Sequence, residues 1–177
     1  MNRNTFIAIL LSGISIWLVT PARKVRSIYQ RLKKTSGPGD HELKTAAIIA
    51  EYIYPEDNMP GALSLGINNF FTIQFKTPYY RKYIPSLKRL TNYLDSESEK
   101  IYGKNFLSTE SKIQHELLDS IASGEKDRVN TAIRKDFYTF IELTLEGCFS
   151  DPMYGGNKNK QAWNLLGGTI REEWFNA

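Results

Sequence analysis

The chain has 177 residues, of which 41% are hydrophobic and 24% charged, values typical of one globular domain and not of a disordered chain. Seven basic and no acidic residues precede position 35, whereas 16 basic and 19 acidic residues follow, a formal charge of −3. A nucleic-acid-binding domain would need a basic face, so we set that class aside. The single cysteine, Cys148, excludes an internal disulfide and a cysteine-based metal site, and we expect it to be a small buried residue.

The chain begins with an apolar run over residues 6–19, which is shorter than the roughly 20 residues that span a bilayer. Arg3 precedes the run and Thr20-Pro21-Ala22 follows it, as in a secretory signal with a weak cleavage site. We expect residues 1–34 to be a signal peptide or a membrane anchor with a basic flank. The opening residues 2–7 also look like a twin-arginine export signal in which Asn4 replaces the second arginine.

The charges around this run favour the opposite orientation. Six basic residues follow it before position 35 and only Arg3 precedes it, so the positive-inside rule would keep the following domain in the cytoplasm. Export to the periplasm and a cytoplasm-facing anchor therefore both stay open.

Helical periodicity dominates after the breaker cluster at residues 35–39, which holds two glycines and a proline. No stretch alternates as a strand would, and no internal repeat occurs. We therefore expect an all-α fold, a single helical domain of about five or six helices over residues 35–177. The expected helices span residues 40–54, 62–75, 79–102, 108–124 and 126–146, with a short one around Trp163.

The ends of these helices follow from residues that cap or break helices. We expect Asp40 and Ser108 to be N-caps, because their side-chain oxygens can accept backbone N–H groups. Pro85 should lie in the first turn of its helix, where its missing N–H is harmless. Gly124 and Gly147 should end their helices, because glycine readily adopts the left-handed conformation.

No residue pattern predicts catalysis. The chain has no glycine-rich phosphate loop, no GxSxG elbow and no HExxH motif. The carboxylates of Glu142, Glu146 and Asp151 are the only candidates for an acid–base pair in catalysis. Acidic residues at this spacing are common on helix surfaces. His41 and His115 lie far apart without a motif, so we expect helix-surface or capping roles for both. We expect no catalytic, cofactor-binding or metal-binding residue in this chain.

A tyrosine-rich stretch at residues 79–83 offers two interpretations. Tyr79, Tyr80 and Tyr83 lie near several basic residues and could form a patch that faces sugar or lipid. They could equally be half-buried tyrosines on an amphipathic helix whose basic side chains are solvated. The second interpretation is the more common arrangement.

The segment after residue 146 is an elaborate loop for a helical protein. Ser150-Asp151-Pro152 predicts a turn, and Gly155-Gly156 allows backbone conformations that other residues avoid. Asn157 can tolerate a left-handed conformation or cap the short helix that carries Trp163. The loop is either a structural connection or a binding element.

The residues of this segment resemble the gluconate 2-dehydrogenase subunit 3 family. The similarity rests on Phe137 and Phe140 and on the runs at residues 144–147, 149–152, 154–157, 162–163 and 166–167. Weaker similarities lie at residues 53–57, 60–62, 66–67 and 102–107. The GFPG-like ending of the family is missing, since Gly167-Gly168-Thr169-Ile170 stands there, and Cys148 replaces a common aromatic.

The resemblance implies a non-catalytic small subunit of a membrane-associated flavin dehydrogenase that oxidises gluconate or another sugar. FAD would lie in a large subunit, haem c in a possible multihaem cytochrome subunit, and the small subunit would assist assembly and export of the large one. The partner-binding candidates are Phe149, Asp151, Tyr154, Gly155, Gly156, Asn157 and Trp163.

Two other functions stay open. A stand-alone, membrane-anchored helical binding protein without a dehydrogenase partner would fit the divergent start and ending. A self-sufficient enzyme would have to use the carboxylates named above. The neighbouring reading frame separates these alternatives, because a small subunit should have a large flavoprotein encoded beside it.

Overall fold

The computed structural model describes residues 37–124 and 129–167, and the apolar run and basic flank lie outside this range. The described residues form six α-helices and no strand, so the expected all-α fold is confirmed. The α-helices are α2 (Asp40–Ile53), α3 (Ile67–Gln74), α4 (Ile84–Tyr102), α5 (Ser111–Ser123), α6 (Thr131–Phe149) and α7 (Gln161–Leu165). Four short 3₁₀ turns join them: η1 (Tyr80–Tyr83), η2 (Phe106–Ser108), η3 (Pro152–Tyr154) and η4 (Lys158–Lys160).

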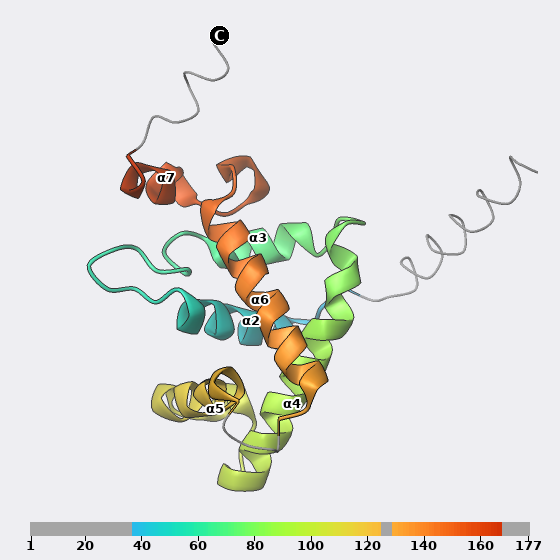
Figure 1. The fold of residues 1–177 in the computed structure, drawn as a ribbon. Coiled ribbons are helices and arrows are strands. Elements are labelled where there is room, and N and C mark those ends of the chain that lie inside the picture. Colours follow the sequence, from blue (N-terminus) through green and yellow to red (C-terminus); the bar gives the residue numbers. More distant parts are fainter. Residues whose placement is uncertain (1–36, 125–128, 168–177) are drawn as a thin grey trace, which may run out of the picture. The chain divides into compact units, whose positions relative to one another are not determined.

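Helix α6 is the central element of the domain. It packs against α2, α3, α4 and α5, and α7 lies beyond its C-terminal end (Figure 1). Apolar residues at three- and four-residue spacing place Leu87, Leu90 and Leu94 of α4 in the core, each fully buried. The rings of Phe71 and Phe140 meet there, with centroids 6.1 Å apart. Each such side chain stabilises the fold by about 1.5–3 kcal/mol relative to exposure.

Two predicted helix starts are wrong by a few residues. Gly39 is the N-cap of α2, and its N–H donates to Glu42 Oε2 at 2.8 Å, so Asp40 is the first helical residue and not the cap. Ser108 ends η2, where its N–H donates to Asn105 Oδ1 at 3.0 Å, and α5 begins only at Ser111. The N–H groups that Glu42 and Asn105 bond are those of Gly39 and Ser108, and not the N–H groups two or three residues later that caps at Asp40 and Ser108 would have bonded.

Helix α3 is also shorter than expected. Residues 62–66 form turns, and Gly66, with φ of 85°, precedes the first helical residue, Ile67. A left-handed residue interrupts the right-handed helical path, so the helix cannot extend back to Ala62. The prediction for Pro85 is confirmed, because it lies in the first turn of α4. Gly124 ends α5 with φ of 64°, as expected.

Helix α6 corrects the predicted stop at Gly147, because it continues to Phe149. A Cβ atom at Gly147 would lie 2.4 Å from Ile67 Cδ1, so this glycine allows α3 to pack closely on α6 and does not end the helix. The helix begins at Thr131, where Asn130 Oδ1 accepts the N–H of Ala132 at 2.7 Å, and the predicted start at Lys126 lies outside the described residues.

Cys148 of α6 is a buried free thiol, as expected from the sequence. Burial, together with the nearby carboxylate of Glu51, raises the pKa of Cys148 to about 12. A thiol with so high a pKa is almost entirely protonated at neutral pH, so this cysteine is chemically inert in the folded domain.

Candidate functional site

Several of the stretches that carry the resemblance meet at one end of the domain. We call residues 54–66 the first loop and residues 149–163 the second loop. The N–H of Lys158 in the second loop donates to the carbonyl of Leu65 in the first at 2.9 Å. A Cβ at Gly66 would lie 3.4 Å from the carbonyl oxygen of Gly155. Residues separated by about 90 positions in the sequence therefore form one surface.

The second loop lies directly against the end of α6 because of Gly156. A Cβ at this position would lie only 1.9 Å from the carbonyl oxygen of Gly147. No other residue leaves room for such an approach of two backbone segments. The preceding Gly155 has φ of 101°, which reverses the chain after η3. The two glycines therefore determine the path of the loop.

Asn157 is the polar centre of the second loop and is fully buried. Its Nδ2 donates to the carbonyl of Ser150 at 3.0 Å, and its Oδ1 accepts the N–H of Ala162 at 2.9 Å. Its φ of 46° is left-handed, as one of the two alternatives expected. The N-cap of α7 is Lys160 and not Asn157, although the Asn157 side chain bonds the N–H of Ala162 within that helix. This side chain closes the loop by joining its beginning to the start of α7.

Two side chains of α3 hold the second loop from outside. Asn69 Nδ2 donates to the carbonyl of Gly155 at 3.1 Å, and Gln74 Nε2 donates to the carbonyl of Tyr154 at 2.9 Å. Neither residue was expected from the sequence to contribute to this site. An amide on a short helix has no local pattern that indicates a partner about 80 positions away.

The aromatic residues that flank the second loop are also used inside the domain. Trp163 Nε1 donates to the carbonyl of Phe149 at 2.8 Å. The ring of Phe149 packs edge-on against Tyr54 of the first loop, with centroids 5.8 Å apart. Asp151 Oδ1 accepts the N–H of Met153 at 3.1 Å and so begins η3. These three side chains stabilise the shape of the loop.

The seven partner-binding candidates therefore differ in what they present to solvent. Gly156 and Asn157 are buried, whereas Phe149, Asp151, Gly155 and Trp163 are partly buried. Tyr154 is 48% exposed, and its neighbour Met153, which the sequence analysis missed, is 75% exposed. Their contact with a partner stays a prediction.

Ile73 of α3 extends the exposed apolar surface beside the second loop. Its side chain is 39% exposed, and its Cδ1 would lie 3.0 Å from a Cβ at Gly155. We call Ile73, Met153 and Tyr154 the apolar tip. The tip is small, but the backbone beneath it is fixed on both sides by the bonds described above.

The three carboxylates considered for catalysis have different surroundings. Glu146 accepts a hydrogen bond from the hydroxyl of Tyr80, Asp151 begins η3, and Glu142 is exposed on α6. Burial and Glu146 together raise the pKa of Tyr80 above its usual value. Over residues 37–124 and 129–167, no cluster of three or more histidine, cysteine or acidic residues could hold a metal ion.

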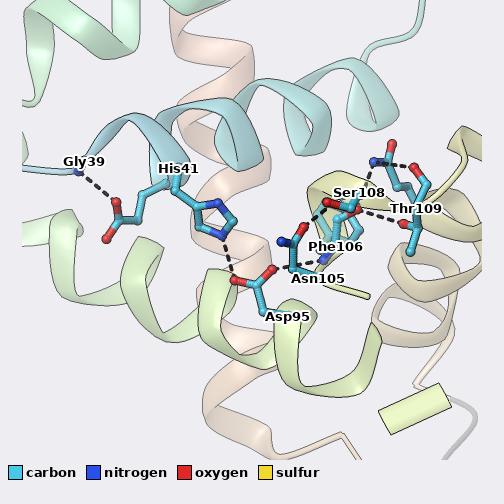
Figure 2. Close-up of polar contacts among 9 residues, drawn as sticks. Gly39, His41, Asp95, Asn105, Phe106, Ser108 and Thr109 are labelled. Carbon is cyan, nitrogen blue, oxygen red and sulfur yellow. Dashed lines mark hydrogen bonds and ion pairs between the residues drawn. The ribbon is translucent and has the colours of Figure 1, made fainter. Parts of the chain in front are cut away.

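The two histidines have structural contacts. Figure 2 shows the ring of His41 pointing from α2 toward Asp95 of α4, with 2.7 Å between Nε2 and Oδ2. The other oxygen of Asp95 accepts the N–H of Phe106 at 3.0 Å, so this carboxylate links two helices and η2 (Figure 2). His115 packs edge-on against Tyr52, with ring centroids 5.6 Å apart.

A family model described as gluconate 2-dehydrogenase subunit 3 matches residues 40–168, which include both loops and all six described helices. No curated protein and no solved structure matches the chain. Among the helices of the described residues, none combines the length and apolar character needed to cross a membrane.

Proposed function

The chain belongs to the gluconate 2-dehydrogenase subunit 3 family, and we propose from this premise that it is the non-catalytic small subunit of a membrane-associated, flavin-dependent dehydrogenase complex that oxidises gluconate or a related sugar. In this proposal the large subunit carries FAD, and a multihaem cytochrome c subunit passes electrons to the membrane. The small subunit assists assembly of the large subunit and its export to the periplasm.

The observation that carries the proposal is the rigid presentation of the apolar tip. Met153 and Tyr154 are exposed, yet the carbonyl of Tyr154 is bound by Gln74 and that of the next residue by Asn69. A loop that is already ordered loses little conformational entropy on binding. Exposed aromatic and methionine side chains are also enriched in the centres of protein interfaces.

The buried members of the loop have a different role in this proposal. Asn157 and Gly156 determine where the tip lies, and Trp163 and Phe149 brace it against the first loop. Their substitution would weaken binding indirectly, because the tip would lose its position. A test of the interface therefore has to change only exposed residues.

The test is co-purification with the flavoprotein that we expect in the neighbouring reading frame. In the double variant Met153→Ala/Tyr154→Ala, we expect the affinity for the flavoprotein to fall about 30-fold, because truncation of interface anchors costs about 2 kcal/mol. The thermal midpoint of the small subunit should change little, since Met153 is 75% and Tyr154 48% exposed.

The matched control is the double variant Ile101→Ala/Tyr138→Ala. These residues are 54% and 53% exposed and lie on α4 and α6, outside both loops. The control should bind the flavoprotein as the unchanged chain does. Equal affinity of the two double variants would place the interface elsewhere, and dye-linked gluconate oxidation by the small subunit alone would overturn the subunit proposal.

A further inference from the structure

The connection between α3 and α4 forms an exposed basic and aromatic surface that the proposed function does not use. Tyr79 is 60% exposed, and Lys82 Nζ lies 4.0 Å from the centroid of its ring and 4.7 Å from that of Tyr83. The Lys82 side chain is exposed, and its hydrogen bond with Tyr83 raises the pKa of Lys82. We call Lys76, Tyr79, Arg81, Lys82 and Tyr83 the basic tyrosine face.

The sequence around this face is strongly biased in charge. No acidic residue lies between Asp57 and Asp95, whereas five basic residues do, namely Lys76, Arg81, Lys82, Lys88 and Arg89. Arg89 is neutralised by Asp136, with 2.7 Å between Nη2 and Oδ1. Among the described residues, no carboxylate forms an ion pair with any of the three cations of the face.

Two of these cations line a pocket of about 240 Å³. Lys76 and Arg81 supply its positive charge, and Leu43 with the buried Phe75 supplies an apolar wall. The remaining lining residues are Gly37, Pro38 and Thr72. Positive charge above apolar side chains suits an amphiphilic anion better than a fully hydrated one.

The position of this pocket in the chain points to a membrane. Gly37 follows directly on the segment that holds an apolar run and seven basic residues without an acidic one. Lysine and arginine near a membrane surface are attracted by anionic lipids, and tyrosine is enriched at the level of the headgroups. The face and the preceding segment therefore favour the same kind of surface.

We propose that the basic tyrosine face binds anionic phospholipid at a membrane surface. A lipid phosphate lies against Lys76 and Arg81 in the pocket, and Tyr79 with Lys82 rests among the neighbouring headgroups. This inference does not depend on a flavoprotein partner. It orients the domain with the connection between α3 and α4 toward the bilayer. The 19-residue helix α4 begins at the face and is about 28 Å long, and α5 follows α4 in the chain.

A fluorescent probe on the face tests the proposal in the full-length chain. Tyr79→Cys labelled with a polarity-sensitive, thiol-reactive dye carries the label only there, because Cys148 is buried. The control carries the same dye at Lys112→Cys, an exposed position on α5. Both are mixed with phosphatidylcholine vesicles that contain or lack phosphatidylglycerol. We expect a blue shift at position 79 only, and only with phosphatidylglycerol.

Charge variants of the labelled chain then measure the strength of the contact. Lys76→Gln/Arg81→Gln should lower the ratio of shifted to unshifted dye about 30-fold, since each surface cation changes this equilibrium about fivefold. Lys104→Gln/Lys135→Gln removes the same charge from exposed positions elsewhere and should leave the ratio unchanged.

Three results would overturn the proposal. The dye at position 79 could stay unshifted on vesicles that bind the chain, or it could respond equally without phosphatidylglycerol. It could also respond to the purified flavoprotein in the absence of vesicles, which would assign the face to an acidic protein surface. The first two results do not bear on the apolar tip, and the third would give the flavoprotein a contact besides the tip. The proposed function is therefore tested separately, by the variants of the tip.

Discussion

Both loops that meet at the end of the domain contain backbone polar groups without helical partners, and a different side chain bonds these groups in each loop. In the first loop, Glu51 of α2 accepts the N–H of Glu56 at 3.0 Å and that of Leu63 at 2.9 Å. In the second, Asn157 bonds the carbonyl of Ser150 and the N–H of Ala162. In each loop one polar side chain satisfies two backbone groups that no helix can pair.

Each loop also contains a glycine that allows close packing of two backbone segments. A Cβ at Gly61 would lie 2.4 Å from the backbone nitrogen of Glu56, just as one at Gly156 would meet Gly147. The difference lies in solvation, since the bonds of Glu51 are exposed and Asn157 is fully buried. The second loop should therefore depend more strongly on its central side chain, because water cannot replace a buried partner.

The largest effect is expected from Gly156→Ala. The added methyl would lie 1.9 Å from a backbone oxygen, which cannot rotate away as a side chain would. We expect the free energy of unfolding to fall by about 3 kcal/mol or more. Urea denaturation measures this change, and Gly37→Ala is the control, because a Cβ there meets nothing within 4 Å. A loss of less than about 1 kcal/mol would mean that the loop is not packed on α6 as described.

Asn157→Ala should cost about 3 kcal/mol. It leaves a partly buried carbonyl and a buried N–H without partners, and it places alanine at φ of 46°. The measurement is again urea denaturation, with Asn159→Ala as the control, since Asn159 is also left-handed (φ 58°) but exposed. Equal losses in the two variants would show that backbone strain, and not the buried bonds, determines the cost.

Glu51→Ala should have the smallest effect of the three, about 1 kcal/mol. The two N–H groups that it releases lie at the surface and can bond to water instead. A loss as large as that of Asn157→Ala, measured in the same denaturation series, would contradict the distinction between the two loops. It would indicate that the first loop is as dependent on its polar centre as the second.

The sequence predicted the helices well and their ends less well. Periodic leucines such as Leu87 and Leu90 identify a helix because the signal is local and repeated. Gly147 was misread because the residue that requires a glycine there, Ile67, lies 80 positions earlier. A glycine that ends a helix and a glycine that allows two helices to pack closely look the same in the sequence. Only the tertiary contact with α3 distinguishes the two roles of Gly147.

The candidate site, too, could be predicted only where its features depend on local sequence. The turn at Asp151-Pro152 and the left-handed conformation of Asn157 follow from properties of those residues alone, and the structure contains them. The contribution of Asn69 and Gln74 could not be predicted, since it depends on how α3 packs beside the second loop. Met153 was overlooked because a single methionine in a turn carries no pattern, although it is the most exposed member of the apolar tip.

The measurement that tests the central claim most directly is amide hydrogen exchange of the small subunit with and without its flavoprotein. If the apolar tip is the docking surface, exchange should slow on binding at residues 153–155 of the second loop and around Ile73 of α3. The amides of α5 should keep their rates. Slowing that is confined to α5, with unchanged exchange at residues 153–155, would contradict the account.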